Sequence, residues 1–322
     1  MLKWFLGNRS ILYSFGGDKE MKEFLKKIHN EEFRWYDQFI LVSILSFLIA
    51  LVGQILGAII TRYVGMITDP NDPVISTALM YFSPIGVWIY LLFLLLIDKR
   101  RRPILKAFGT KTSGNNLKNL LIGLAIGFGL NFSCAVVAML KKDIHIHFDQ
   151  FDPLGLLIVL VCVFIQSSSE EALDRGYLYQ VLRKGYRNPW VAIVVSSVMF
   201  SGMHLMNPGF GLIPFLNILA SGLMFALAVY YFDSIWMAFG IHTGWNYTQS
   251  ILLGLPNSGL VVPFSLFKLD TASAVSSFAY DVKFGIEGTI LSTIVLYLAC
   301  IVIFLIGEKR GVRSHNIWKE GK

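Results

Sequence analysis

The sequence predicts an all-α integral membrane protein, a bundle of about eight transmembrane helices with both termini in the cytoplasm. Composition is the first indication, because 55% of the 322 residues are hydrophobic and only 15% are charged. In a typical soluble domain, about a quarter of the residues are charged. The mean hydropathy of +0.60 and the placement of Lys and Arg between the apolar segments are the second and third indications.

Eight apolar segments approach the roughly 20 residues that a helix needs to cross the hydrocarbon core of a bilayer. The fifth segment is short, and the fourth is long and mixed in polarity. The predicted spans cover approximately residues 38–60, 74–97, 117–140, 154–183, 190–206, 211–232, 234–253 and 286–306.

The basic residues between these spans predict the orientation. With the N-terminus inside, 22 of the Lys and Arg residues lie in cytoplasmic segments and 5 lie in outside loops. Cytoplasmic loops of membrane proteins carry this excess of positive charge. The net charge of +7 is therefore attributed to topology and to anionic lipid headgroups, and nucleic-acid binding is excluded as a function.

Three parts of the chain follow from this topology. Residues 1–37 form a cytoplasmic segment, residues 38–306 form the transmembrane bundle, and residues 307–322 form a basic cytoplasmic tail. Within the first part, residues 18–34 predict an amphipathic helix at the membrane surface, because apolar residues recur at helical spacing opposite a lysine-rich face. The apolar positions are Met21, Phe24, Leu25 and Ile28.

Ionisable side chains inside predicted spans are candidates for a functional site, because a charge at the bilayer centre costs about 2.5 to 3.5 kcal/mol on insertion scales. Three groups occur, on the fourth, fifth and seventh spans. They are Glu170, Glu171, Asp174 and Arg175; His204; and His242 with Asn246.

The spacing within these groups predicts which side chains face each other. Glu171 and Arg175 are four residues apart and can pair on one helix face, whereas Glu170 points about 100° away from Glu171. His242 and Asn246 are also four residues apart and share a face. At 1.5 Å per residue, the three groups lie at a similar depth, roughly 12 to 21 Å from the cytoplasmic edge.

This set of side chains suits the hydrolysis of an amide. A glutamate and a histidine can activate a water molecule between them, and an imidazole and an amide that donate to one point can hold an oxyanion. No serine or cysteine nucleophile is then required. The ligands Glu170, His204 and His242 would equally suit one divalent metal such as zinc with a bound water, so a metal and a metal-free mechanism both remain open.

The same residues form three motifs that, taken together and in this order, resemble those of the CPBP family. "EEALDR" is EExxxR with Glu170, Glu171 and Arg175; "FSGMH" is FxxxH with His204; and "HTGWN" is HxxxN with His242 and Asn246. This family includes type II CAAX prenyl proteases and bacteriocin-processing or bacteriocin-immunity proteins. The motif core covers residues 154–253, and "GLPNSG" and "FGIEG" further along are similar to bacterial members.

The resemblance implies an eight-helix membrane endopeptidase and a role for each matched residue. Glu170 would be the water-activating base with His204 as its partner, and His242 and Asn246 would stabilise the tetrahedral intermediate. Glu171 and Arg175 would hold the helix in register. The family is commonly classed as metalloproteases, although a metal-free glutamate mechanism is also argued. A zinc mechanism would need Glu171 as its base, and Glu171 faces away, which favours the metal-free form.

We therefore expect an endopeptidase that cuts a membrane-associated protein or prepeptide, in a bacterial cell membrane. Two other functions fit the same residues. One is a non-catalytic membrane protein that confers self-immunity to a bacteriocin by binding a peptide, and the other is a proton-coupled transporter with a glutamate–histidine relay. The second is disfavoured because spans four to seven show no inverted repeat.

Overall fold

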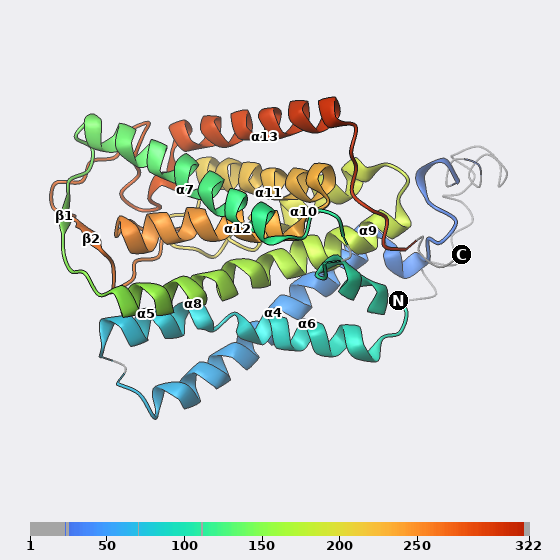
Figure 1. Ribbon diagram of the computed structural model, residues 1–322, viewed down its shortest axis with the longest axis horizontal. Helices are drawn as coiled ribbons and strands as arrows, with labels where there is room; N and C mark the ends of the chain where they lie inside the picture. Colours follow the sequence, from blue (N-terminus) through green and yellow to red (C-terminus); the bar gives the residue numbers. More distant parts are fainter. Residues whose placement is uncertain (1–22, 24–25, 70, 111, 319–322) are drawn as a thin grey trace, which may run out of the picture.

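The computed structural model describes residues 23, 26–69, 71–110 and 112–318. Residues 18–22, 24 and 25 of the predicted interfacial helix over 18–34, and residues 319–322 of the basic tail, lie outside this part of the chain. Residues 23 and 26–28 are helical, whereas residues 29–34 are not. The remainder is almost entirely helical, as the apolar segments predict (Figure 1).

In the part of the chain that the structure describes, six helical stretches are long and apolar enough to cross a membrane, as in a multi-pass membrane protein. Their outer faces carry exposed large apolar side chains, for example Ile44 and Phe47 on the first helix, which suits contact with lipid. The stretches are α4 (Phe39–Gly65), α5 with α6 (Pro73–Ile97), α7 (Leu117–Leu140), α8 through α9 (Pro153–Gly185), α11 (Leu212–Phe232) and α13 (Ile290–Arg310).

The fifth and seventh predicted spans are shorter helices. α10 covers Pro189–Gly202, and α12 covers Ile235–Asn246 before the helix changes its winding. The prediction that the fifth span reaches residue 206 is wrong: the chain turns after Gly202, ahead of Asn207, Pro208 and Gly209, and such residues favour turns. The total of eight spans and the cytoplasmic position of the termini stay predictions.

Two further boundaries differ from the prediction. The second span is interrupted at Pro84, between α5 (Pro73–Phe82) and α6 (Ile85–Ile97), because proline removes a backbone donor. The last helix begins at Ile290 and not at residue 286: residues Ile286–Gly288 form the short 3-10 turn η5, and Thr289 caps α13 by accepting from the backbone N–H of Ser292.

A two-stranded antiparallel ribbon corrects the all-α expectation. β1 (Ile146–Phe148) pairs with β2 (Phe267–Leu269), with Ile146 opposite Leu269. The strands link the loop before α8 to the loop after α12 at one end of the bundle (Figure 1). The sequence-based prediction missed them because each strand has only three residues.

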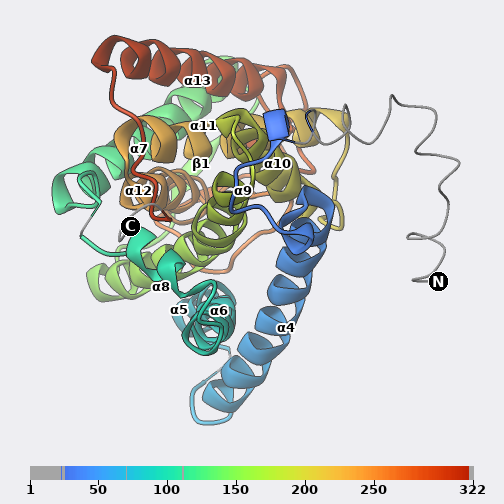
Figure 2. The ribbon, with the colours of Figure 1, turned by 90° about the vertical axis from the view of Figure 1, so that its right-hand side faces the viewer.

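Helix α12 lies in the middle of the bundle. Figures 1 and 2 show it beside α7, α8 and α11, with α13 and α4 on opposite outer sides. The approach of α7 requires glycine: a Cβ at Gly127 would collide with the carbonyl oxygen of Ile241, and one at Gly244 would collide with that of Leu124. Small residues allow such close packing of membrane helices. The buried position of α12 places His242 and Asn246 inside the protein.

Candidate active site

The helices that carry Glu170, His242 and Asn246 change from α- to π-helical winding shortly after these residues, and Arg175 lies within the first π-helical segment. α8 ends at Glu171 and continues as η3 (Ala172–Leu178) and then α9 (Tyr179–Gly185). α12 ends at Asn246 and continues as η4 (Tyr247–Leu252). π-helical turns are rare and occur frequently at functional sites. This feature was not predicted from the sequence.

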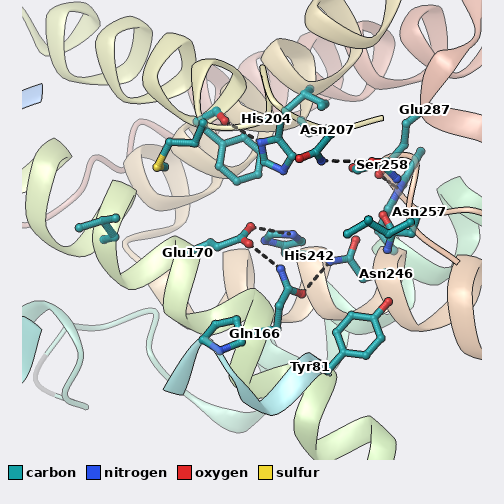
Figure 3. A pocket seen from close by; sticks show the side chains of 18 of the residues that line it. Tyr81, Gln166, Glu170, His204, Asn207, His242, Asn246, Asn257, Ser258 and Glu287 are labelled. Carbon is teal, nitrogen blue, oxygen red and sulfur yellow. Dashed lines mark hydrogen bonds and ion pairs between the residues drawn. The ribbon is translucent and has the colours of Figure 1, made fainter. Parts of the chain in front are cut away.

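The four predicted catalytic residues line one pocket. Its volume is about 320 Å³, and Glu170, His204, His242 and Asn246 all contribute to its wall. Figure 3 shows Glu170, His242 and Asn246 along one wall and His204 along the facing wall. The structure therefore brings together the residues that the three motifs place on separate helices.

Glu170 is held at one oxygen and free at the other. Its Oε1 accepts a hydrogen bond of 2.7 Å from Nε2 of Gln166. Its Oε2 lies 3.8 Å from Nε2 of His242 and is buried without a hydrogen-bond partner among the described residues. A carboxylate fixed in this way presents one free oxygen to the pocket.

Gln166 is a site residue that the sequence analysis missed. Its Oε1 accepts from Nδ2 of Asn246 at 3.0 Å, while its Nε2 donates to Glu170. The amide therefore links the two helices and fixes the orientation of both partners (Figure 3). Its position four residues before Glu170 was the available signal, since residues at this spacing share a helix face.

Glu171 has a second role beside the predicted ion pair. Its Oε1 lies 3.0 Å from Nη1 of Arg175, as predicted, and 3.1 Å from Nδ1 of His242. Glu171 and Arg175 are both fully buried. Because a carboxylate accepts, Nδ1 of His242 donates, and this fixes the ring with Nε2 toward Glu170.

Aromatic rings hold His242 and Arg175 from a third side. The His242 ring stacks on Phe225 with centroids 5.0 Å apart, and Phe200 meets it edge-on at 5.7 Å. The Arg175 guanidinium lies over the same two rings and donates to the carbonyl oxygen of Gly222 at 2.8 Å. The phenylalanine of the second motif thus packs between the first and third motifs.

His204 lies in the turn after α10 and not on the helix. Its Nδ1 donates to the carbonyl oxygen of Phe200 at 2.9 Å, which leaves Nε2 to the pocket. Figure 3 shows the ring across the pocket from Glu170.

Loops complete the wall around His204. Asn207 donates to the carbonyl oxygen of Ser258 at 3.1 Å, and Glu287 accepts from the backbone N–H and the hydroxyl of Ser258. Burial raises the pKa of Glu287, although the Ser258 hydrogen bonds and the charge of His204 act to lower it. The sequence analysis missed this carboxylate; its signal was an acidic residue inside the predicted last span.

A metal in this pocket would need several of its side chains to converge on one point. Glu170 Oε2 and His242 Nε2 are two facing donors, but a catalytic zinc needs three protein ligands. Across the described residues, no three His, Cys, Asp or Glu side chains gather as a metal site requires. His204 stands on the other wall, so the predicted set of three ligands does not fit this arrangement.

Comparison with protein families identifies part of the chain. Residues 152–248 match the family "Type II CAAX prenyl endopeptidase Rce1-like". This segment is a Rce1-like domain of the CPBP family. It contains α8 to α12 and therefore all seven residues of the three motifs.

One curated relative is similar to part of the chain. The Bacillus subtilis (strain 168) protein named "Uncharacterized protein YyaK" is 27% identical over 153 aligned positions, which cover 44% of this chain. The alignment spans about half, 48%, of the relative's own length. No solved structure matches the chain significantly.

Proposed function

We propose that the protein is an intramembrane endopeptidase of a bacterial cell membrane that hydrolyses a peptide bond in a membrane-associated protein or prepeptide. The Rce1-like domain supports the reaction class. The observation that carries the proposal is Glu170, which lines a pocket shared with two histidines; Gln166 fixes one of its oxygens, and the other is buried without a hydrogen bond among the described residues, 3.8 Å from Nε2 of His242.

In the proposed reaction, Glu170 acts as the general base. Its Oε2 takes a proton from a water molecule, whose oxygen attacks the peptide carbonyl carbon, and the same proton then passes to the leaving amine. The product amine and carboxylate contain the atoms of the water, so no further reactant is needed. Gln166 keeps the base oriented, which favours attack from a defined direction.

The oxyanion of the tetrahedral intermediate would face His242, Asn246 and His204. Nε2 of His242 can donate only when the ring carries both protons, because Nδ1 already donates to Glu171. Asn246 would turn its amide from Gln166 toward the pocket to donate. The same condition holds for His204, whose Nδ1 donates to the carbonyl oxygen of Phe200: Nε2 accepts while the ring is neutral and could hold the attacking water for Glu170, and it donates only when the ring carries both protons. No step is routed through a metal.

A peptidomic comparison tests this proposal. Membranes from cells that carry the wild-type protein or Glu170→Gln are compared at matched expression, with Glu31→Gln as the control, because Glu31 is exposed and outside the pocket. We expect peptide termini that vanish in Glu170→Gln and in His204→Ala but persist in Glu31→Gln. Identical peptidomes together with a retained phenotype would refute proteolysis and favour a peptide-binding immunity protein.

A further inference from the structure

The pocket wall carries two carboxylates and, apart from two histidines, no basic side chain among its described residues. Glu170 and Glu287 both line it, and none of the described lining residues is Lys or Arg. Figure 3 shows the two carboxylates at different ends of the pocket. Arg175 is close to this region, but it is committed to Glu171 and lies against Phe200 and Phe225.

Glu287 is held by neutral donors. Oε2 accepts from the N–H of Ser258 at 2.6 Å and from its hydroxyl at 2.7 Å, and Oε1 accepts from Nε1 of Trp245 at 2.9 Å. These bonds orient the carboxylate without cancelling its charge. Only 7% of the residue is exposed, so a charge there is weakly screened and acts strongly on a ligand in the pocket.

The backbone around Glu287 is built to hold this position. Ser258, Gly259 and Gly285 all have left-handed φ values of 49°, 82° and 84°. At Gly285 a Cβ would collide with the carbonyl oxygen of Pro256, so the two loops can meet only with glycine there. The proposed hydrolysis does not use the positioned carboxylate of Glu287. This carboxylate lines the pocket and is therefore available to a ligand.

We propose that the pocket selects a substrate segment with a positive charge, a Lys or Arg side chain, close to the scissile bond, with Glu287 as the partner of that charge. The inference rests on the proposed function and adds the substrate class to it. An acidic side chain or a free carboxylate at the same place is disfavoured, because like charges in a desolvated site repel. Glu287 is a specificity residue and takes no part in the hydrolysis.

The first test is cleavage-site profiling with a proteome-derived peptide library. The purified full chain in lipid nanodiscs is compared with Glu287→Gln, Glu287→Asp and the exposed control Glu31→Gln, and Glu170→Gln defines background. We expect Lys and Arg to be enriched about tenfold near the cut. The enrichment should disappear in Glu287→Gln and persist in Glu287→Asp and Glu31→Gln. Enrichment that is absent from the wild type, or unchanged in Glu287→Gln, would overturn the inference.

A structural role of Glu287 gives a different result in the same experiment. If the carboxylate only supports the loop, Glu287→Gln should lower cleavage of all peptides in parallel and leave the sequence preference unchanged. If it selects charge, peptides with neutral residues near the cut should be cleaved within about threefold of the wild-type rate.

A binding measurement separates this inference from the proposed function. Blocked fluorescent peptides that are apolar except for one central Lys, Gln or Glu are titrated against the wild-type protein and Glu287→Gln in nanodiscs. We expect the Lys peptide to bind about tenfold more tightly than the Glu peptide, and only in the wild type. If no cleavage depends on Glu170, the endopeptidase proposal fails and this titration still decides the charge selection; equal affinities for the three peptides would refute it.

Discussion

The two walls of the pocket are built in different ways. One wall consists of helices α8 and α12. Hydrogen bonds join Asn246 to Gln166 and Gln166 to Glu170, and another joins His242 to Glu171. The two groups face each other where Glu170 lies 3.8 Å from His242. The facing wall consists of the turn after α10 and two loops that meet through Asn207, Ser258 and Glu287.

The difference fits the roles that we propose for the two walls. Side chains on helices are positioned more accurately than those on loops, which suits bond-breaking chemistry. Loops vary more readily and often carry recognition. We therefore assign hydrolysis to the helix wall, with His204 reaching it from the turn, and selection of the substrate to the loop wall. The following changes are ways to test this division.

The largest effect is expected for Glu170→Gln. The substitution keeps the hydrogen bond to Gln166 possible but removes the base, so kcat should fall by about 10³-fold. Thermal stability should change little, because the side chain is partly exposed to the pocket and makes no ion pair below 3.8 Å. Single-turnover cleavage and a melting curve measure both. A kcat within tenfold of the wild type would mean that Glu170 is not the base and would contradict the assignment of hydrolysis to the helix wall.

Glu171→Gln should reduce both activity and stability. It leaves the buried Arg175 without its ionic partner, and breaking a buried pair costs about 3 to 5 kcal/mol. It also removes the acceptor that orients His242, for an expected loss of about 10²-fold in kcat. Comparing the melting temperature and kcat with those of Glu170→Gln separates the two carboxylates. Equal stability of the two variants would contradict the structural role of Glu171.

Much of the helix wall could be predicted from the sequence, because the pattern repeats at the period of the helix. Glu171 and Arg175, and His242 and Asn246, are each four residues apart, and the apolar segments placed their helices at similar depth. The contact between Glu171 and His242 could not be predicted in this way, since it joins residues 71 positions apart on different helices.

The loop wall could not be predicted from the sequence, for a physical reason. Its shape depends on left-handed residues such as Ser258 and Gly285 and on contacts between distant loops, which have no periodic signature. The same reason explains the errors in the fold. α10 ends at Gly202, α13 begins at Ile290, and the second predicted span breaks at Pro84. These boundaries follow local turn and capping chemistry, which the apolar character of the segments does not reveal.

A smaller effect is expected for Gln166→Leu, which keeps the side-chain size but removes the hydrogen bond to Glu170. Hydrogen bonds to charged groups contribute about 1.5 to 3 kcal/mol, so kcat should fall by about tenfold or more while KM changes little. The control is Gln38→Leu, since Gln38 is exposed before α4. A change in KM alone would mean that Gln166 acts in substrate binding and not on the base.

The smallest effect is expected when a chelator is added. A bound zinc would have to join Glu170 and His242 of the helix wall to His204 of the loop wall, and these side chains do not gather as one ligand set. Incubation of the purified protein with 1,10-phenanthroline or EDTA should therefore change the cleavage rate by less than about twofold. Loss of activity that added zinc restores would show that the two walls close on a metal, and the division between a chemical and a selecting wall would then fail.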